Sequence, residues 1–363
     1  MSKKPFGPSL YYASDKNVFE ALTQRKVDVQ TIYKLFESRN ILISKKTSRD
    51  ELAKYFARLN HDYYDHRDIS SKLGVVPRRE RITSMDIIGD VSVETIKICA
   101  DALKKEMQQM GDVVQISRNG DNLAVNIQYS SFNYKLSEFS QVQVRDGVIE
   151  FIKTDAGYII RNTQNDFINS TRDLLVIKAE KSNGVDFEKN KVSLFDITSH
   201  KLRNKFFYNL INTIPEHPKV DVTDVYVYKA KPDMDENETN ELDQEFNDVH
   251  IERVLLRGRD VTRSELLNEL VDDDTYYIIK AGWNIEDKLG TGNVYAVEAV
   301  FSDPVNCTGF SFLLRRVYPS ESGKVSSRFR APSKGEVDLV SRIIENRSRD
   351  LVLELREEFF GKK

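Results

Sequence analysis

Two histidines and two aspartates lie close together in one predicted helix, where their spacing could serve metal chemistry. His61 and Asp65 are four residues apart, and so are Asp62 and His66, so each pair shares a helical face. Imidazole nitrogens and carboxylate oxygens are common zinc ligands. Polar residues on an exposed helix reach the same spacing by chance, and we favour that interpretation. The sequence therefore predicts neither a metal site nor another cofactor.

Two other patterns carry some of the residues of an enzyme without completing a site. Asp173, Glu180 and Lys181 have the residue types of a divergent metal-dependent nuclease, but they lie in a predicted helix and lack the spacing that this chemistry needs. The segment from Gly290 to Asn293 is not followed by Lys-Ser or Lys-Thr, so it predicts a turn rather than a phosphate-binding loop. The five histidines are scattered along the chain, so no Ser-His-Asp cluster can be assembled from the sequence.

An acidic run extends from residue 233 to residue 248. Its first residues resemble the start of a calcium-binding loop, but the sixth position is Glu238 instead of Gly and the twelfth is Gln244 instead of Glu. The prediction is therefore a solvated loop whose charges repel one another. Mimicry of nucleic acid by this run, directed at the basic end of the chain, is the less favoured alternative.

Positive charge is concentrated in the first 81 residues. This segment holds 17 Lys and Arg against 10 Asp and Glu, a balance of +7, whereas the whole chain carries −3 and the rest must therefore carry −10. Cations that neutralise phosphates release counterions, so local rather than net charge governs binding to nucleic acid. A solvated Lys-rich surface would have the same composition. The residues predicted to contact nucleic acid are Lys45, Lys46, Arg49, Lys54, Arg58, Arg78, Arg79 and Arg81.

Two short amphipathic helices must position the first of these cations. Asp28 is a good N-cap for the first helix, and Asn40 tolerates the left-handed conformation that often ends one. Ser48 and Glu51 have the spacing of a capping box for the second helix. The apolar residues at helical spacing are Val29, Ile32, Tyr33 and Phe36 in the first helix and Leu52, Phe56 and Leu59 in the second.

Residues 28–59 resemble the SAP family of DNA-binding motifs, in which a helix, an extended loop after a Gly-Leu pair and a second helix ending in Arg-Leu form a tiny core. The matching positions are Val29, Ile32, Phe36, Asn40-Ile41 in place of Gly-Leu, Leu52 and Arg58-Leu59. The loop is about two residues longer than in the family, and Lys45 and Lys46 stand near the position of the family's usual Gly. The resemblance implies contact with the phosphate backbone through Lys45, Lys46, Arg49 and Lys54. A helical hairpin that packs a core or docks a protein has the same pattern.

The rest of the chain is expected to form an α+β protein, divided by the Pro77-containing stretch 74–81. We expect a basic helical module at 1–81, a first α+β domain at 82–215 and a second at 216–363. The second would contain the acidic loop and a long C-terminal helix. Helices are predicted at 61–73, 92–111, 165–181, 198–214, after Thr262 with Glu265 and at 333–360. Strands are predicted at 113–117, 123–129, in a meander reaching Arg161 with turns at 145–147 and 155–157, and at 220–231, 250–257, 276–283, 294–301 and 310–318.

The C-terminal helix has an apolar stripe that is interrupted at Arg347 and Ser348. We expect its second half, with Leu351, Leu355 and Phe359, to meet another subunit or a protein partner. The alternative is that both halves close the core of the second domain.

Composition excludes several classes of protein. With 40% hydrophobic and 31% charged residues, no run of eighteen apolar residues and no apolar centre near the N-terminus, we expect a cytoplasmic protein that does not enter membranes. Cys99 and Cys307 are too few for a disulfide framework. The predicted function is non-enzymatic DNA binding within a larger assembly. The alternatives are a protein-interaction scaffold, for example in a bacterial antiphage or genome-maintenance system, and third a divergent nuclease.

Overall fold

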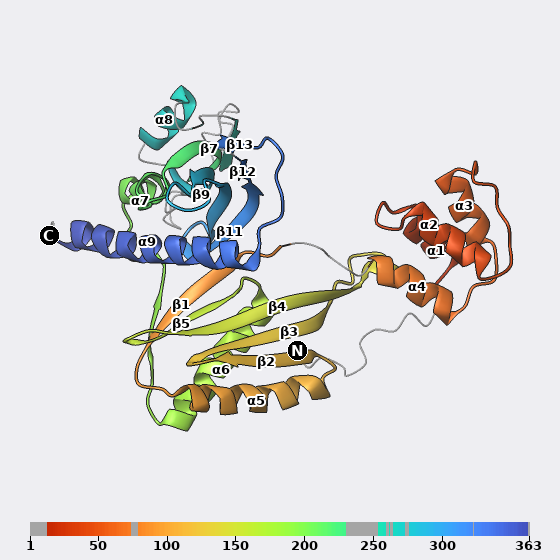
Figure 1. Ribbon diagram of the computed structural model, residues 1–363, viewed down its shortest axis with the longest axis horizontal. Coiled ribbons are helices and arrows are strands. Elements are labelled where there is room, and N and C mark those ends of the chain that lie inside the picture. Colours follow the sequence, from red (N-terminus) through yellow and green to blue (C-terminus); the bar gives the residue numbers. More distant parts are fainter. Residues whose placement is uncertain are drawn as a thin grey trace, which may run out of the picture. The chain divides into compact units, whose positions relative to one another are not determined.

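The computed structural model describes residues 13–73, 79–229, 253–258, 261, 264–272, 276–321 and 323–361, which form an α+β protein, as predicted (Figure 1). The chain divides into two compact units built from interleaved stretches. Unit 1 contains residues 1–78, 91–152 and 170–186, and unit 2 contains residues 79–90, 153–169 and 187–363. The predicted domains instead follow one another along the chain, and that division stays a prediction. The predicted acidic loop lies outside the described residues.

Unit 1 begins with four helices, which we call the helical module: α1 (Asp15–Thr23), α2 (Val29–Glu37), α3 (Arg49–Ala57) and α4 (Tyr63–Leu73). Their apolar faces form one core, in which the rings of Phe36 and Phe56 meet edge to face at 5.4 Å. Phe139, from a short 3-10 helix η1 (Glu138–Ser140), is fully buried in the same core. The module is therefore completed by a residue from a later part of the chain. Val29, predicted to join the core, is exposed at the start of α2.

The remainder of unit 1 contains α5 (Val93–Gln109), β2 (Val113–Asn119), β3 (Asn122–Phe132), β4 (Val142–Lys153) and most of α6 (Asp166–Asn183). The predicted hairpin is confirmed, because Asn119 pairs with Asn122 across the two-residue loop. The predicted turn at 145–147 is wrong: Gly147 lies inside β4, opposite Ile127 of β3. Ten successive pairs with β3 hold these residues extended, which overrides the local turn preference of Asp-Gly.

Unit 2 is built on an antiparallel sheet in the order β5-β1-β11-β10-β9-β7-β8, with β6 paired to β1. The strands are β1 (Ile82–Ile88), β5 (Gly157–Thr163), β6 (Glu188–Lys191), β7 (Lys219–Lys229), β8 (Arg253–Arg257), β9 (Tyr276–Glu286), β10 (Val294–Asp303) and β11 (Thr308–Tyr318), with a separate pair of β12 (Ser320–Glu321) and β13 (Lys324–Val325). The sequence did not predict β1, which pairs with β5 over its whole length and with β11 at Ile82.

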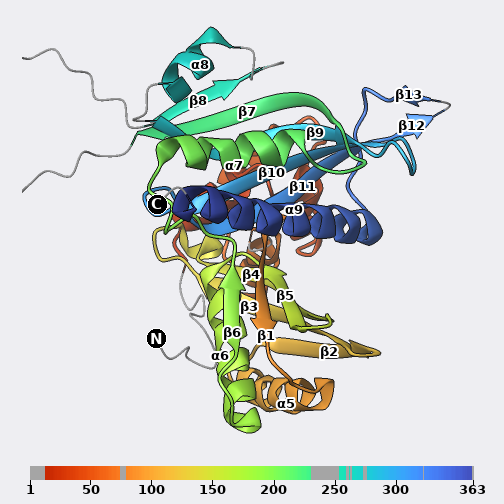
Figure 2. The same cartoon turned by 90° about the vertical axis from the view of Figure 1, so that its left-hand side faces the viewer.

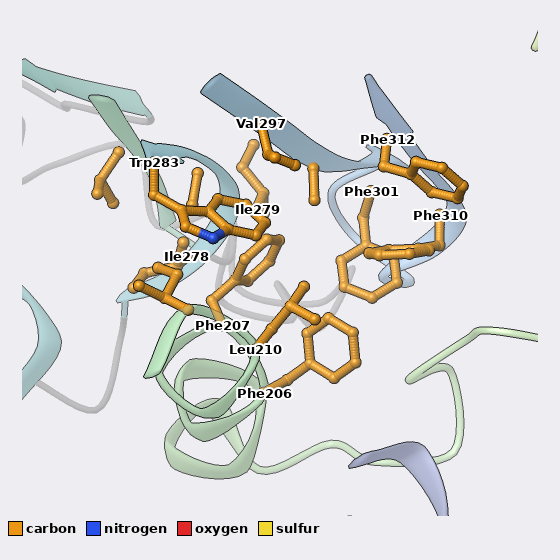
Figure 3. Packing of buried hydrophobic residues seen from close by; sticks show 14 of the residues in the cluster. Phe206, Phe207, Leu210, Ile278, Ile279, Trp283, Val297, Phe301, Phe310 and Phe312 are labelled. Carbon is orange, nitrogen blue, oxygen red and sulfur yellow. The ribbon is translucent and has the colours of Figure 1, made fainter. Parts of the chain in front are cut away.

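One face of this sheet is covered by helices α7 (His200–Asn212), α8 (Glu265–Asp272) and α9 (Lys334–Phe360). Figure 2 shows α7 and α9 running alongside each other over the sheet. Phe206 and Phe207 of α7 enter the core against Phe301 of β10 and Phe310 of β11, with ring centroids 5.3 to 5.8 Å apart (Figure 3). Trp283 of β9 is fully buried beside them. Aromatic side chains thus fill the part of this core between α7 and strands β10 and β11.

The prediction that the second half of α9 meets a partner is wrong for the residues that carried it. Leu351 and Leu355 are buried in the core of unit 2, and Phe359 packs against that core. The polar interruption is accommodated within unit 2, because the buried Ser348 hydroxyl donates to the Glu345 carbonyl at 3.0 Å and Arg347 donates to Thr213 at 2.7 Å. Both halves of the helix therefore close the core of their own unit.

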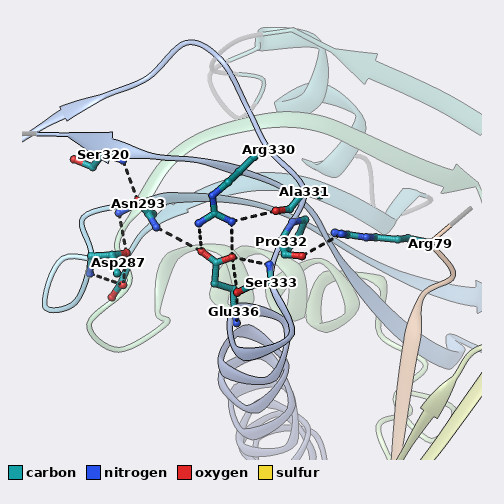
Figure 4. A network of polar contacts seen from close by, with 10 residues as sticks. Arg79, Asp287, Asn293, Ser320, Arg330, Ala331, Pro332, Ser333 and Glu336 are labelled. Atoms are coloured by element: carbon teal, nitrogen blue, oxygen red, sulfur yellow. Dashed lines mark hydrogen bonds and ion pairs between the residues drawn. The ribbon is translucent and has the colours of Figure 1, made fainter. Parts of the chain in front are cut away.

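A polar network fixes the start of α9 (Figure 4). Ser333 and Glu336 form the predicted capping box, and Arg330 donates to both carboxylate oxygens of Glu336 at 2.7 and 2.6 Å. These contacts hold the pKa of Glu336 at about 2, with the hydrogen bond from Arg330 as the main cause. The segment at 290–293 is a turn, as predicted, because the Asp287 carboxylate accepts the amides of Gly290 and Thr291.

Candidate nucleic-acid interface

Helix α2, which precedes the predicted binding loop, is fixed by local bonds at both of its ends. Asp28 caps α2 by accepting the Thr31 amide at 2.6 Å, and hydrogen bonding from the Thr31 side chain, followed by this amide, lowers the pKa of Asp28. Asn40 has a φ of 56°, so it ends α2 in the left-handed conformation, and the Ile41 amide donates back to the Phe36 carbonyl. Each of these features confirms the sequence prediction for this helix.

The segment from Ile41 to Thr47 then crosses to α3 in a fixed path. Ile41 and Ile43 pack against the module core, and the Tyr33 hydroxyl donates to the Ser44 carbonyl at 3.2 Å. A turn follows, closed by the Thr47 amide donating to the Ser44 carbonyl at 3.0 Å. The predicted capping box of Ser48 and Glu51 begins α3. The loop is therefore a defined surface rather than an unconstrained connection.

Lys45 and Lys46 lie at the turn of this loop and are exposed. Lys54 on α3 and Arg58, the C-cap residue directly after α3, are also exposed. They are four residues apart in helical conformation, so they share its outward side. Within the part of the chain that the structure describes, none of these four side chains makes a hydrogen bond or an ion pair. We call the four the basic surface: Lys45, Lys46, Lys54 and Arg58.

Two exposed apolar side chains near these cations were missed by the sequence analysis. Leu42 is 94% exposed in the loop, and Tyr55 is exposed on the outward side of α3. The signal for Leu42 was present in the sequence: in an extended segment neighbouring side chains point to opposite sides, so burial of Ile41 and Ile43 turns Leu42 outward. Burial of Leu52, Ala53 and Phe56 likewise leaves Tyr55 on the outer face of its helix.

Arg49, predicted to contact phosphate, has a structural role instead. Its Nε donates to the Leu22 carbonyl at 3.2 Å and its Nη2 to the Gln24 carbonyl at 2.7 Å. These carbonyls belong to the end of α1, where helices leave acceptors without intrahelical partners. Arg49 therefore ties α3 to α1, and the prediction of phosphate contact is corrected for this residue.

Two of the remaining predicted arginines, Arg79 and Arg81, are not part of the helical module. Arg78 lies outside the described residues. Arg79 and Arg81 belong to unit 2, where Arg79 donates to the Pro332 carbonyl at 3.1 Å before α9 (Figure 4) and Arg81 donates twice to Glu298. The structure thus leaves four of the eight predicted residues exposed in the helical module and gives the other described ones internal partners.

No known protein-family model matches this chain, and comparison with curated proteins finds no significant match. The SAP resemblance therefore depends on the residues of the loop and its two helices alone.

The alternative chemistries receive no support from the geometry of the described residues. Over those parts of the chain, no group of three or more His, Cys, Asp or Glu is placed to hold a metal ion. His66 is buried against His61, with Nε2 to Nδ1 at 2.8 Å, and burial followed by the neighbouring His61 lowers the pKa of His66. Asp173 is exposed on α6 while Glu180 is buried. None of the helices in the described ranges is both long and apolar enough to cross a membrane.

Proposed function

We propose that this protein binds nucleic acid, in the form of duplex DNA, through the basic surface. The observation that carries the proposal is a contrast within the helical module. Arg49 donates its hydrogen bonds to two backbone carbonyls. The other four cations are exposed and make no internal bond among the described residues: Lys45, Lys46, Lys54 and Arg58. Cations without internal bonds can contact phosphates without first breaking a bond within the protein. The resemblance to SAP motifs supports the same surface.

The contacts would be made mainly with the phosphate backbone. The Ser48 and Glu51 side chains already bond each other's backbone amides at the start of α3, so the lysine ammonium groups rather than free helix amides supply the attraction. Phosphate contacts carry no sequence information, so little sequence preference is expected. Four such contacts predict that affinity falls roughly 100-fold between 50 and 200 mM salt.

Fluorescence anisotropy with two unrelated duplexes tests this on the full chain, because Phe139 completes the helical module and a fragment ending at residue 81 would lack it. Lys45→Glu combined with Lys46→Glu should weaken binding to both duplexes and lower the salt slope by about two, as expected for two lost phosphate contacts. The matched control is Lys97→Glu with Lys105→Glu, two exposed lysines of α5 in the same unit.

Arg49 is left unchanged in this experiment because its substitution would disturb the contact between α1 and α3. Equal affinities of the loop variant and the α5 control would contradict the proposal, and so would binding that does not change with salt.

A protein-interaction scaffold is the second candidate, favoured by the exposed Leu42 and Tyr55 beside the same cations. Substitutions in the loop distinguish the two functions. A docked protein should depend mainly on Leu42, whereas DNA should depend mainly on the lysines. If Leu42→Asp abolishes a complex that survives Lys45→Glu with Lys46→Glu, the surface binds protein.

A further inference from the structure

The face of the unit 2 sheet opposite the aromatic core carries a group of charged side chains. Asp224 pairs with Gly282, and Gly282 pairs with Glu298, so all three lie in one row across β7, β9 and β10. Lys280 lies two residues along β9 on the same face. Arg315 of β11 and Arg81, just before β1, reach the same row. We call these five the charged cluster: Arg81, Asp224, Lys280, Glu298 and Arg315.

Glu298 is the centre of the charged cluster and is only 3% exposed. Its Oε1 accepts Arg81 Nε at 2.9 Å and Nη2 at 2.5 Å, and its Oε2 lies 3.1 Å from Lys280 Nζ and 3.5 Å from Arg315 Nη1. Burial acts to raise the pKa of Glu298, but the bonds and charges of Arg81 and Lys280 outweigh it, so the pKa is lowered. One carboxylate thus orients three cations.

Asp224 is 2% exposed and only partly satisfied. Its Oδ2 accepts the Thr223 hydroxyl at 2.9 Å and lies 3.4 Å from Arg315 Nη1, whereas its buried Oδ1 has no hydrogen-bond partner among the described residues. The carboxylate lies over Gly282, where any Cβ would collide with it. A buried oxygen without a donor costs free energy unless water or a ligand completes it.

A second buried polar atom on this face has no partner. Ser311 of β11 pairs with Val300, which pairs with Lys280, so the three lie in the row next to Glu298. The Ser311 side chain is fully buried, and its hydroxyl has no hydrogen-bond partner within the described parts of the chain. An acceptor group is therefore missing near Ser311, and a donor is missing near Asp224.

The charged cluster carries more positive than negative charge and opens to solvent on its cationic side. Three cations face two carboxylates, a balance of +1, and the side chains of Arg81 and Arg315 are 39% and 36% exposed. Arg81 uses Nε and Nη2 toward Glu298, and Arg315 uses only Nη1 toward the carboxylates. Over the described ranges their other N–H groups have no partner, so two oriented guanidinium groups face outward.

We infer that the charged cluster binds a phosphate group of a hydroxyl-bearing ligand, a nucleotide or the ribose-phosphate backbone of RNA. The phosphate oxygens would accept from Arg81, Lys280 and Arg315, since planar guanidinium groups match phosphate geometry. A hydroxyl of the ligand would donate to Asp224 Oδ1. Glu298 is a positioning residue that holds the cations. This site lies in unit 2 and does not depend on the function proposed for the helical module.

Isothermal titration calorimetry tests the inference with three probes: inorganic phosphate, ATP and a 12-nucleotide single-stranded RNA. The full chain should carry Lys45→Glu with Lys46→Glu, so that the basic surface does not contribute. Arg315→Gln should weaken binding by at least roughly tenfold, the loss of one charge-assisted contact. Arg342→Gln, which removes an exposed arginine of α9 on the other side of the sheet, should change the affinity by less than about twofold.

Arg315→Lys keeps the charge without the planar fork and carries the test if Arg315→Gln does not fold, which thermal unfolding will show. It should bind less tightly than the wild type and retain the fold. Binding of ATP alone identifies a nucleotide site, and binding of the oligonucleotide identifies a nucleic-acid backbone. The inference is overturned if the wild-type cluster binds none of the three probes, or if the Arg315 variants bind as tightly as Arg342→Gln.

Discussion

The basic surface of the helical module and the charged cluster of unit 2 both gather positive charge, but their cations differ in what they contact. Lys45 and Lys46 project from a loop, and no carboxylate bonds them among the described residues. In the cluster, one buried carboxylate, Glu298, receives Arg81, Lys280 and Arg315. The number of Lys and Arg in a stretch therefore does not identify a binding surface. The carboxylates and carbonyls that fold beside those residues decide which cations remain free.

The difference also predicts what each group contributes to stability. An exposed lysine without a partner adds little to the free energy of unfolding, so the loop can be altered without harm to the fold. A buried carboxylate among three cations is different, because removing it leaves three neighbouring cations without their shared partner.

Glu298→Gln should produce the largest effect on stability. Removing one partner of a fully buried ion pair costs about 3–5 kcal/mol. Because Arg81 and Arg315 are 39% and 36% exposed, solvent screens their pairs, and the cost here should lie at or below the lower end of that range. Urea denaturation of the full chain measures the change in the free energy of unfolding. Lys54→Gln on the basic surface is the matched comparison and should change it by less than about 0.5 kcal/mol. If both variants changed the free energy of unfolding by similarly small amounts, Glu298 would contribute no more to stability than an exposed lysine, and the contrast between the two groups of cations would be wrong.

The parts of the fold that the sequence predicted are those fixed by neighbouring residues. Asp28, Asn40 and Ser48 set the ends of α2 and the start of α3 through bonds that span three to five residues, so their types and spacing were sufficient. The capping box of Ser333 and Glu336 was predictable for the same reason. These local devices depend little on the rest of the chain.

The parts that could not be predicted depend on distant partners. Arg49 bonds a carbonyl 27 residues earlier, and Arg81 bonds a carboxylate 217 residues later, so both resembled free cations in the sequence. For the pair of Arg81 and Glu298, the sequence around Glu298 did contain a signal of the contact. Glu298 is a single charge within the apolar strand from Val294 to Phe301, and such an isolated charge indicates a buried partner.

Arg49→Ala tests the intermediate case, a cation of the helical module that bonds backbone carbonyls of the same module. Loss of its two hydrogen bonds to the end of α1 should lower the free energy of unfolding by about 1–2 kcal/mol, since bonds from a charged donor exceed neutral ones. Amide hydrogen exchange should increase in α1 while DNA affinity falls less than in the loop variant. If the variant lost DNA binding fully while amide hydrogen exchange in α1 stayed unchanged, Arg49 would contact DNA as the sequence predicted.

The smallest effect is expected at the start of α9, where a partly exposed cation pairs with a carboxylate. The contacts with Arg330 and Ser333 lower the pKa of Glu336 from 4.5 to about 2. A carboxylate whose pKa is lower in the folded state stabilises the fold fully above its unfolded pKa, and this contribution decreases as pH falls toward the folded pKa. The contribution should therefore be complete above pH 4.5 and lost progressively between pH 4.5 and about 2.

Arg330→Gln removes the main cause of that shift. Because the Arg330 side chain is 45% exposed, solvent screens the pair, and the variant should lose less than about 1 kcal/mol at neutral pH. The difference in free energy of unfolding between wild type and variant should then shrink as the pH is lowered from 5 toward 3. Arg328→Gln, a nearby exposed arginine with no carboxylate contact among the described residues, provides the control. A difference that stays constant with pH would show that Arg330 acts through packing rather than through the charge of Glu336. The contact between Arg330 and Glu336 would then not stabilise the fold by ionic attraction, unlike the contacts of the charged cluster.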